Sequence, residues 1–362
     1  MVQFRATMLG MSTPERAAKY RLFAAEQSAA WAMFARAASV RFAGVDAAGM
    51  PVSRTLSAVV LDGAICVHGA DDGEKLGLLG PVVASVDEVI AQVPSYWIHP
   101  ELACPASTYY LSAIARGELR RVEDLTRKAA ILSALMERFQ PEGGYAPIHA
   151  QDKRYTKVLE SLLVAELRPT ELSAKRKLGQ HRSKRQVEAV LEGLWQRGTP
   201  GDLRAIRLIR EAHPDGPRPS FLEGPEGSTL CVAPDAQDAR EVADLLAGQY
   251  WTHGFSASQL AAAHHQSTAW IVAREAGRVV ASARALADGA RLAWVMDVIV
   301  HPERRGRGYG RALLRLLMDH PLLRQTACIA LRTRTPAYYE PLGFARGEAL
   351  GVELRLLRPL PR

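Results

Sequence analysis

The feature that most constrains the fold is a glycine-rich segment between an apolar strand and an amphipathic helix. Residues 301–314, HPERRGRGYGRALL, place a glycine at every second position from Gly306 to Gly310, with arginines between and beside them. The apolar, β-branched VMDVIV precedes the segment, and leucines at helical spacing follow it. Because glycine has no Cβ atom, successive main-chain N–H groups can converge on one anion at the positive end of the helix dipole. The segment therefore predicts a turn that binds a pyrophosphate.

Taken alone, the same segment also fits a solvated turn with surface arginines. A P-loop is excluded because no Gly-Lys-Ser/Thr sequence follows the glycines. A dinucleotide-binding fold is disfavoured because residues 270–300 have the pattern of three strands joined by short turns, which gives an antiparallel arrangement. The choice between a solvated turn and an anion site therefore depends on the elements around the segment.

The chain has 362 residues, a length that fits two domains. The proline- and glycine-rich segment HPDGPRPSFLEGPEGS, residues 213–228, is the best candidate for a linker. We therefore expect a first domain over residues 1–197, a helix and linker over 198–228, and a second domain over 229–362. Many of the positive charges behind the net charge of +8 lie in two local runs, KRKLGQHRSKR at 175–185 and the arginines of the glycine-rich segment.

The first domain has the pattern of a small antiparallel barrel. A helix is expected from Thr13 to Ala38, followed by short strands that are separated by Asp-Ala-Ala-Gly and Asp-Gly turns. An amphipathic helix, LTRKAAILSALMERF, and a last strand, ESLLVAELRP, complete it. Few helices between many short strands favour a barrel over a doubly wound sheet. The expected class is α+β: an antiparallel β-barrel with helices, followed by a mixed α/β sheet that ends in the strand GVELRLL.

The order of elements over about residues 229–357 resembles the GNAT family of acyl-CoA N-acyltransferases. Three strands, an Arg-x-x-Gly-x-Gly turn, a helix and a further strand precede the segment PAYYEPLGF. Arg305, Gly308 and Gly310 match the family's (Q/R)xxGx(G/A) pattern, and residues 338–344, YYEPLGF, match its (F/Y)YE-x-x-GF segment. The resemblance implies that the second domain is a GNAT fold.

By this resemblance, the amides of the turn hold the pyrophosphate of acetyl-CoA, and the preceding strand pairs with the pantetheine arm. Tyr339 is implied to protonate the departing thiolate, a step that a phenol of pKa near ~10 suits against a thiol of pKa about 8.5; its alternative role is a core aromatic. Asp297 is the nearest carboxylate, either a base that acts through water or a structural hydrogen-bond partner. The residues implied to bind acetyl-CoA are Val298, Ile299, Val300, Arg305, Gly306, Arg307, Gly308, Tyr309, Gly310 and Arg311.

The acceptor is implied to be an amine of a small molecule or peptide, but its pocket departs from the family pattern. The commoner version of LRTRTPAYYEPLGF carries Asn ahead of the tyrosine, and here Arg332 and Thr335 occupy that region. The helix that starts near Asp238 and the segment Trp251–Ala263 are expected to form part of the acceptor lid. His264 and His265 are adjacent on a predicted helix and face different ways, so we expect no metal site.

In the first domain, Arg54 lies on one predicted strand, His68 and Gly69 end another, and Lys75 lies at a short helix. Each alone is more often a surface or core residue, but together they fit a phosphate and a flat ring. With the later KRKLGQHR segment, they resemble the pyridoxamine 5′-phosphate oxidase-like, FMN-binding split-barrel family over about residues 20–197.

This second resemblance implies FMN as a cofactor, bound between two split barrels of a homodimer. Two alternatives stay open: a barrel that has lost its cofactor and serves only for dimerisation, and a heme-binding barrel with His68 or His99 as the iron ligand. The residues implied to hold FMN are Arg54, His68, Gly69, Lys75, Lys177 and Gln180.

These patterns predict an acyl-CoA-dependent N-acyltransferase fused to a flavin-type barrel. One alternative is a flavin or heme oxidoreductase. Another is an FMN-binding, transcriptional-regulator-like protein that binds DNA through the basic run at 175–185 and the helices after it. Nucleic acid is not the expected partner, because that helix pair is generic.

The remaining composition favours a cytoplasmic protein. No uncharged apolar stretch reaches about 18 residues, so no membrane span is expected, and residues 1–21 lack the apolar core of a secretory signal. The four cysteines are far apart and form no CxxC pair. Neither a zinc site nor a disulfide framework is therefore expected, and a reducing cytoplasm is the expected location.

Overall fold

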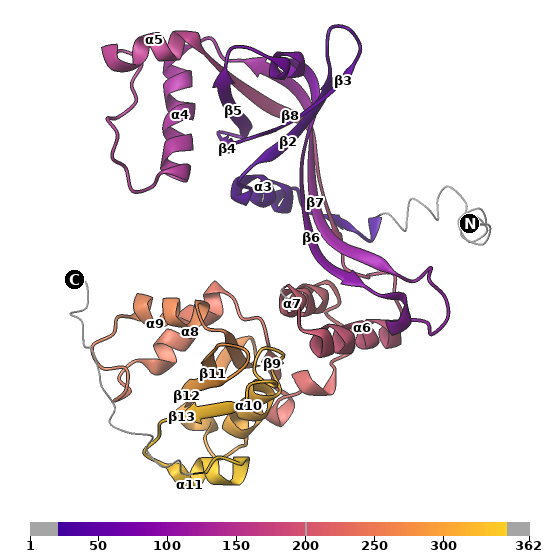
Figure 1. Cartoon of the computed structure of the whole chain (residues 1–362), viewed down its shortest axis with the longest axis vertical. Helices are drawn as coiled ribbons and strands as arrows, with labels where there is room; N and C mark the ends of the chain where they lie inside the picture. Colours follow the sequence, from indigo (N-terminus) through magenta and orange to yellow (C-terminus); the bar gives the residue numbers. More distant parts are fainter. Residues whose placement is uncertain (1–20, 200, 346–362) are drawn as a thin grey trace. The chain divides into compact units, whose positions relative to one another are not determined.

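The computed structural model describes residues 21–199 and 201–345, which form two compact units. It confirms the predicted α+β class, because one unit is built on an antiparallel sheet and the other on a mixed sheet (Figure 1). The first unit comprises Met1–Val190 and Leu208–Pro217, and the second comprises Leu191–Arg207 and Arg218–Arg362.

Two consecutive helices contribute to both units. Helix α6 (Lys184–Arg197) begins in the first unit and ends in the second, and helix α7 (Asp202–Ala212) begins in the second and ends in the first. Helix α7 lies within the predicted helix-and-linker segment 198–228, and the proline- and glycine-rich residues 213–228 contain two short 3-10 turns, Ser220–Leu222 and Pro225–Gly227. The domain boundaries proposed from the sequence stay a prediction.

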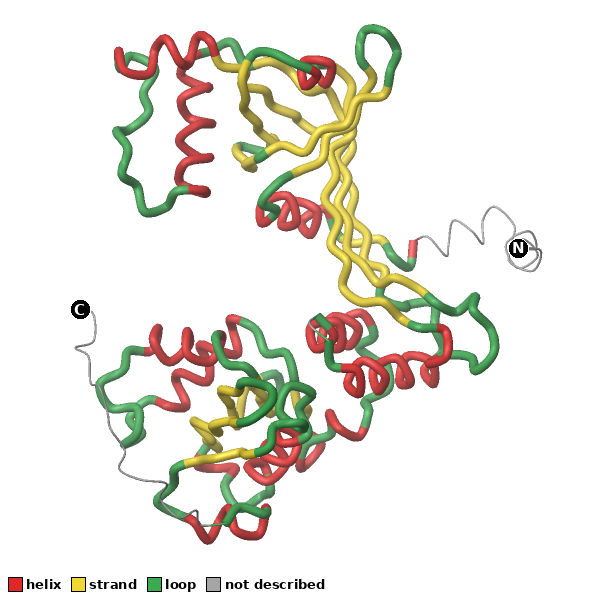
Figure 2. The backbone as a smooth tube through the Cα atoms, in the orientation of Figure 1, coloured by secondary structure: helices red, strands yellow, loops and turns green. Residues whose placement is uncertain are grey.

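The first unit is an antiparallel sheet with strand order β3-β2-β6-β7-β8-β5-β4, and β1 pairs with β8 outside that path. Strands β6, β7 and β8 are long and run side by side (Figure 2). The strands are β1 (Ala24–Ala25), β2 (Val40–Val45), β3 (Pro51–Leu56), β4 (Ala58–Leu61), β5 (Ala64–Ala70), β6 (Gly80–Val93), β7 (Ser107–Arg121) and β8 (Leu162–Lys177).

The opening helix of the described chain is shorter than predicted. Helix α3 spans only Gln27–Arg36, because β1 precedes it and pairs with β8 through Ala24 and Lys175. Residues 13–20 lie outside the described residues. Strand β8 is longer than the predicted ESLLVAELRP, because β7 supplies a partner as far as the Tyr110–Lys177 pair. Tertiary pairing therefore decided both boundaries.

Helix α4 (Leu125–Phe139) covers the core of the first unit. The Asp124 carboxylate caps it by accepting hydrogen bonds from the N–H groups of Thr126 and Arg127. The buried cluster beneath it consists of Val59, Ala64, Cys66, Val122, Ile131, Leu135 and Val164. Helix α5 (Lys153–Ser161) follows α4 and leads into β8.

The second unit is a mixed sheet with strand order β13-β12-β11-β10-β9, antiparallel except for the parallel pair β12–β13. The predicted last strand, GVELRLL at 351–357, lies outside the described residues. The elements are β9 (Thr229–Cys231), α8 (Ala236–Leu246), α9 (Ala257–His265), β10 (Ala269–Glu275), β11 (Arg278–Ala287), β12 (Leu292–Val300), α10 (Tyr309–Met318), β13 (Cys328–Leu331) and α11 (Pro336–Tyr339).

Helices α8 and α9 bury their apolar faces on this sheet. Asp235 and Ser256 cap them through capping boxes, which satisfy the first N–H groups of each helix. Within residues 21–199 and 201–345, no helix is long and apolar enough to cross a membrane. The core beneath the helices includes Ala239, Val242, Ala243, Leu246, Leu260, Trp270, Val272, Val279 and Ile299.

The end of helix α6 is anchored in the second unit by Trp195. Its ring stacks on Phe221 with centroids 4.9 Å apart, and its Nε1 donates to the Asp319 carboxylate at 2.9 Å. The His320 ring meets the same indole edge-on at 5.7 Å and is fully buried. Burial, with the Arg324 guanidinium nearby, lowers the pKa of His320 to about 4.

Acidification is expected to destabilise the second unit through His320. The folded pKa lies below the ordinary 6.5, so the neutral ring contributes its full stability above pH 6.5, and that contribution is lost as the pH falls toward 4. The loss should reach about 3 kcal/mol in the free energy of unfolding. Urea unfolding followed by tryptophan fluorescence at several pH values measures it. His320→Gln should flatten the dependence, while the exposed control His253→Gln should retain it; equal slopes in both variants would contradict the assignment.

Candidate functional site

The predicted pyrophosphate turn connects strand β12 to helix α10 through a 3-10 turn at Pro302–Arg304. Gly306 and Gly308 have φ angles of +77° and +89°, and Gly308 is the N-cap of α10. Residues with a Cβ atom are strained in this left-handed region. Glycine at these two positions therefore allows the chain to reverse directly into the helix.

In the described structure, the last main-chain N–H groups of the turn and the first of α10 are open donors. Between Gly306 and Arg311, no main-chain N–H donates to a carbonyl within the described part of the chain. The first such bond at the start of α10 runs from the N–H of Ala312 to the carbonyl of Gly308, at 3.0 Å. A row of open donors at the positive end of a helix is a site for an anion.

Two arginines of the turn are paired with carboxylates. Arg304 holds Glu275 through two bonds of 2.6 and 3.1 Å, and Arg307 pairs with Glu226 at 3.1 Å. An arginine that is paired with a carboxylate adds little net positive charge to the turn. The anion site therefore depends chiefly on main-chain donors.

The side chains of the other predicted residues of the turn differ in their contacts and exposure. Tyr309 is buried, with its hydroxyl donating to Glu275 at 3.2 Å, so only its main chain is available at the turn. Arg305 donates from Nε to the carbonyl of Val300 at 3.3 Å. Arg311 is exposed on the first turn of α10. The main-chain N–H of Arg305 donates to the Pro302 carbonyl at 3.3 Å, so the open amides of the turn begin at Gly306.

Strands β12 and β13 part in the middle of the sheet. Their parallel pairing ends at Val295 and Leu331, although β12 continues to Val300. On the opposite side, the register between β12 and β11 shifts just after Met296, where Asp297 has a φ of +49°. This β-bulge bends the strand. The last residues of β12 therefore keep an edge that β13 does not cover, and the predicted Val298, Ile299 and Val300 lie along it.

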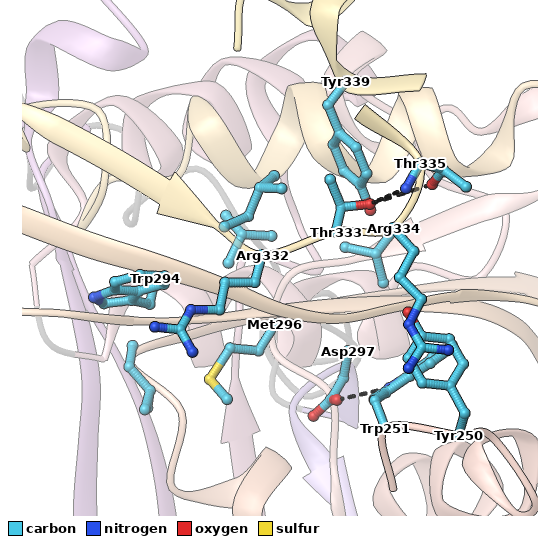
Figure 3. A pocket seen from close by; sticks show the side chains of 14 residues that line it. Tyr250, Trp251, Trp294, Met296, Asp297, Arg332, Thr333, Arg334, Thr335 and Tyr339 are labelled. Carbon is cyan, nitrogen blue, oxygen red and sulfur yellow. Dashed lines mark hydrogen bonds between the residues drawn. The ribbon is translucent and has the colours of Figure 1, made fainter. Parts of the chain in front are cut away.

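A cleft of about 700 Å³ opens where the strands part (Figure 3). It is formed by the loop after α8, strands β11 and β12, and the end of β13 with the segment that follows. The residues that line it are Tyr250, Trp251, Leu286, Trp294, Val295, Met296, Asp297, Val298, Leu331, Arg332, Thr333, Arg334, Thr335 and Tyr339.

Tyr339 lines the cleft at the end of α11. Burial, with Tyr338 and Tyr250 nearby, raises the pKa of its hydroxyl above the ordinary value, so the phenol is protonated near neutral pH. The neighbouring Tyr338 is placed differently: its hydroxyl lies where a Cβ on Gly310 would be. Tyr339 therefore lines the cleft, whereas Tyr338 packs on the start of helix α10.

Asp297 forms an ion pair at the base of the cleft. Its Oδ2 accepts a hydrogen bond from Arg284 Nε at 2.6 Å, and its Oδ1 accepts one from Trp251 Nε1 at 3.1 Å (Figure 3). The side chains of Arg284 and Asp297 are only 9% and 10% exposed, so the charges are largely shielded from water. The pair fixes the orientation of the carboxylate, and Asp297 as a base stays a prediction.

Sequence reasoning missed the aromatic and cationic walls of the cleft. The Arg334 guanidinium lies 3.8 Å from the ring centroid of Tyr250, and the Arg332 guanidinium lies 5.8 Å from that of Trp294. Trp294 occurs in the strand sequence LAWVM, where alternation could have placed it on an exposed face. No local pattern indicates the partner of Arg334, because Tyr250 is distant in the sequence.

In the first unit, part of the predicted flavin site comes together around η1 (Glu74–Leu78). Arg54 contacts Glu74, and the Lys75 side chain packs against Gly69, where a Cβ would lie 3.1 Å from Lys75 Cε. Lys75 Nζ also binds the Asp72 carboxylate at 3.0 Å. Both cations that were predicted to hold a phosphate therefore have carboxylate partners.

The rest of the predicted flavin site lies elsewhere in the unit. His68 pairs with Val164 near the start of β8, whereas Lys177 ends that strand and Gln180 follows it. At ~3.3 Å per residue, the thirteen positions from 164 to 177 span roughly 43 Å of strand. The structure therefore does not bring the two groups together within one chain. A second copy is required for them to share one site.

The described histidines, cysteines and acids do not form a metal-binding cluster. Among residues 21–199 and 201–345, no three or more of them lie close enough to hold an ion. His264 is buried and hydrogen-bonded through Nδ1 to the Leu260 carbonyl at 2.8 Å.

Two family models match separate parts of the chain. Residues 26–176 match the model described as pyridoxamine 5′-phosphate oxidase, and residues 236–344 match the one described as the acetyltransferase (GNAT) family. Both resemblances predicted from the sequence are confirmed.

Two curated N-acetyltransferases are similar to about a quarter of this chain. Serotonin N-acetyltransferase 2, chloroplastic, of Oryza sativa subsp. japonica is 38% identical over 89 residues, 23% of this chain and 44% of that protein. GCN5-related N-acetyltransferase 1, chloroplastic, of Arabidopsis thaliana is 33% identical over 88 residues, 24% of this chain and 45% of that protein. The chain thus spans less than half the length of these relatives.

Solved structures with some similarity to this chain each cover less than half of it. A GNAT-family protein from Xanthomonas campestris pv. campestris has 27% identity and a TM-score of 0.32, covering 35% of this chain and 93% of its own. The FAD and heme binding protein from Mycobacterium smegmatis has 22% identity and a TM-score of 0.36, covering 42% of this chain and 71% of its own.

Proposed function

We propose that the protein transfers an acetyl group from acetyl-CoA to an amine, because residues 236–344 form a GNAT acetyltransferase domain, in a chain whose residues 26–176 form a pyridoxamine 5′-phosphate oxidase-like domain. One observation carries the proposal. The open amides from Gly306 to Arg311 follow directly on the uncovered edge of β12, and that edge borders the cleft containing Tyr339.

The proposed binding mode uses this continuity. The amides of the turn bind the diphosphate of acetyl-CoA, and the uncovered main chain of Val298–Val300 pairs with the pantetheine arm. The acetyl thioester then reaches the cleft at the bulge beside Asp297. Main-chain donors fixed by a helix start and a strand need no rearrangement on binding.

The reaction forms one bond and breaks another. The neutral acceptor amine attacks the thioester carbonyl carbon, the new C–N bond forms, and the C–S bond breaks to release a thiolate. Tyr339 donates its phenolic proton to the sulfur as the C–S bond breaks, because its raised pKa keeps the phenol protonated near neutral pH. The proton lost by the amine returns to the phenolate through solvent or a base.

Asp297 is the proposed base or positioning group. It is the sole carboxylate among the described residues that line the cleft. Its contacts with Arg284 and Trp251 hold it at the bulge, beside the proposed position of the thioester. A proton from the amine would reach it through water.

Gly308→Glu should abolish acetyl-CoA binding. The substitution places a carboxylate among the amides that are proposed to bind the diphosphate, and the dissociation constant measured by isothermal titration should rise at least roughly 100-fold. Gly289→Glu is a matched control, because Gly289 also has a positive φ of +75° and open space around it. That control should bind within about threefold of the wild type. Unchanged affinity in Gly308→Glu would refute the anion site.

Tyr339→Phe should lower kcat by roughly 100-fold, with little change in the KM for acetyl-CoA, because only the proton donor is removed. Tyr338→Phe serves as the control, since the neighbouring hydroxyl lies over Gly310 and not in the cleft. Steady-state kinetics with both variants separate the two tyrosines. An equal loss of kcat in both, or none in Tyr339→Phe, would remove Tyr339 from the mechanism.

For the first unit, we propose a flavin site that two copies of the chain share, with FMN as the flavin. The separation of His68 from Lys177 along β8 favours this arrangement, because one chain cannot place both groups at one ligand. Bound phosphate would displace Asp72 from Lys75 and Glu74 from Arg54. The flavin would supply redox chemistry; the residues of this chain would supply only its binding.

Native mass spectrometry of the purified full chain is expected to show a two-chain species that carries flavin mass. A flavin absorption band should accompany it, since bound flavin absorbs in the visible range. A single-chain species without a flavin band would contradict the shared site. A two-chain species without flavin would retain the homodimer and refute the cofactor.

A cytoplasmic location is proposed on chemical grounds. All four cysteines are free, with Cys66 buried and Cys104 and Cys328 exposed. Exposed free thiols are compatible with a reducing compartment.

A further inference from the structure

The cleft of the second unit is walled by aromatic rings that water reaches. Tyr250, Trp251 and Trp294 line it and are 55%, 37% and 38% exposed, and Tyr339 completes the aromatic set. Large rings gathered in one concave surface are unusual for a purely solvated face. Flat apolar walls bind flat apolar groups, with stacked or edge-on geometry.

Arg334 adds an open set of hydrogen-bond donors to these walls. Its guanidinium lies over the Tyr250 ring, with 3.8 Å between the guanidinium carbon and the ring centroid (Figure 3). Stacking uses the face of the guanidinium and leaves its in-plane N–H groups directed outward. Arg334 makes no salt bridge to any described residue, and it is exposed on the cleft. Such a fork matches the two oxygens of a carboxylate or phosphate.

The charge balance of the cleft favours an anion. Arg334 contributes a positive charge, and the lining carboxylate, Asp297, is bonded to Arg284 outside the lining. No described lining residue therefore offers a carboxylate free of a cationic partner. An acceptor with several ammonium groups would meet like charge here, and desolvated like charges repel.

The same charges favour the reactive form of the acceptor amine. Nearby cations lower the pKa of an ammonium group, and only the neutral amine can attack a thioester. An amine that enters beside Arg334 therefore loses its proton more readily than in water. This effect reduces the demand on a strong general base.

We propose that the acceptor of this cleft is an arylalkyl amine that also carries a carboxylate or a phosphate monoester. Its ring lies against Tyr250, Trp251 and Trp294, and Arg334 binds its anionic group. The inference rests on the proposed acetyl transfer, because it names the acceptor class of that same cleft. It excludes polyamines and other polycationic amines as preferred acceptors.

The test measures binding of three probes that share one ring, namely phenylacetate, phenyl phosphate and phenethylamine. Isothermal titration uses the full chain saturated with coenzyme A. At least one anionic probe should bind roughly tenfold or more tightly than phenethylamine. Tighter phenylacetate identifies a carboxylate, and tighter phenyl phosphate identifies a phosphate. Equal binding, tighter phenethylamine or no binding of any probe overturns the inference.

Arg334→Gln should raise the dissociation constant of the preferred anionic probe by roughly 10- to 100-fold, because a charge-assisted contact is lost. The same variant should bind phenethylamine no more weakly than the wild type. Arg291→Gln is the matched control, since Arg291 is exposed in the same unit and does not line the cleft. Equal weakening in both variants, or weakening for all probes, overturns the role of Arg334.

Titration of acetyl-CoA into the same proteins distinguishes a wrong acceptor class from a failure of the proposed acetyl transfer. If the wild type and Arg334→Gln both bind acetyl-CoA but the wild type prefers phenethylamine, the acceptor class alone is wrong. If the wild type does not bind acetyl-CoA, the proposed acetyl transfer fails, and the acceptor class fails with it. Acetylation of L-phenylalanine in preference to phenethylamine would support the carboxylate arm directly.

Discussion

The ion pair between Arg284 and Asp297 fixes the point at which the second sheet opens. Both side chains are nearly buried, and leaving one of two such charges without its partner costs about 3–5 kcal/mol. The pair therefore ties β12 to β11 where their register shifts, directly after β13 has ceased to pair with β12. The uncovered strand edge, the cleft and the approach to the glycine turn all follow from that position. The ion pair therefore fixes the geometry of the sheet, apart from any role of Asp297 in the reaction.

Much of this site could be predicted from the sequence because its determinants are local. Gly306 and Gly308 have the positive φ angles that alternate glycines before a helix suggest, and the residues after them form the expected amphipathic helix. The short-turn pattern of residues 270–300 gave antiparallel strands in the expected order. Tyr339 belongs to the YYEPLGF motif, which follows strand β13, and it lines the cleft. In each case, the prediction needs only the backbone preferences of the residues and their neighbours in the sequence.

What escaped prediction depends on contacts between distant segments. The stacking of Arg334 on Tyr250 and the pairing of Arg284 with Asp297 join residues on different elements, so no spacing rule shows them. The same reason explains the opening helix. Residues with good helix propensity at 24–25 form a strand because β8 offers them a partner. Likewise, Lys177 could not be placed relative to His68 until the length of β8 was known.

The distribution of positive charge separates the two ends of the proposed substrate path. Arg304 and Arg307, beside the turn, are offset by Glu275 and Glu226, although the ligand proposed there is a diphosphate. Arg334, in the cleft, makes no ion pair with any described residue. The turn does not need a net positive charge to bind a diphosphate, because fixed main-chain donors select an oxyanion by geometry. For the acceptor proposed in the cleft, the corresponding charged group is the side chain of Arg334, which stacks on Tyr250. The net charge of +8 therefore says little about coenzyme binding.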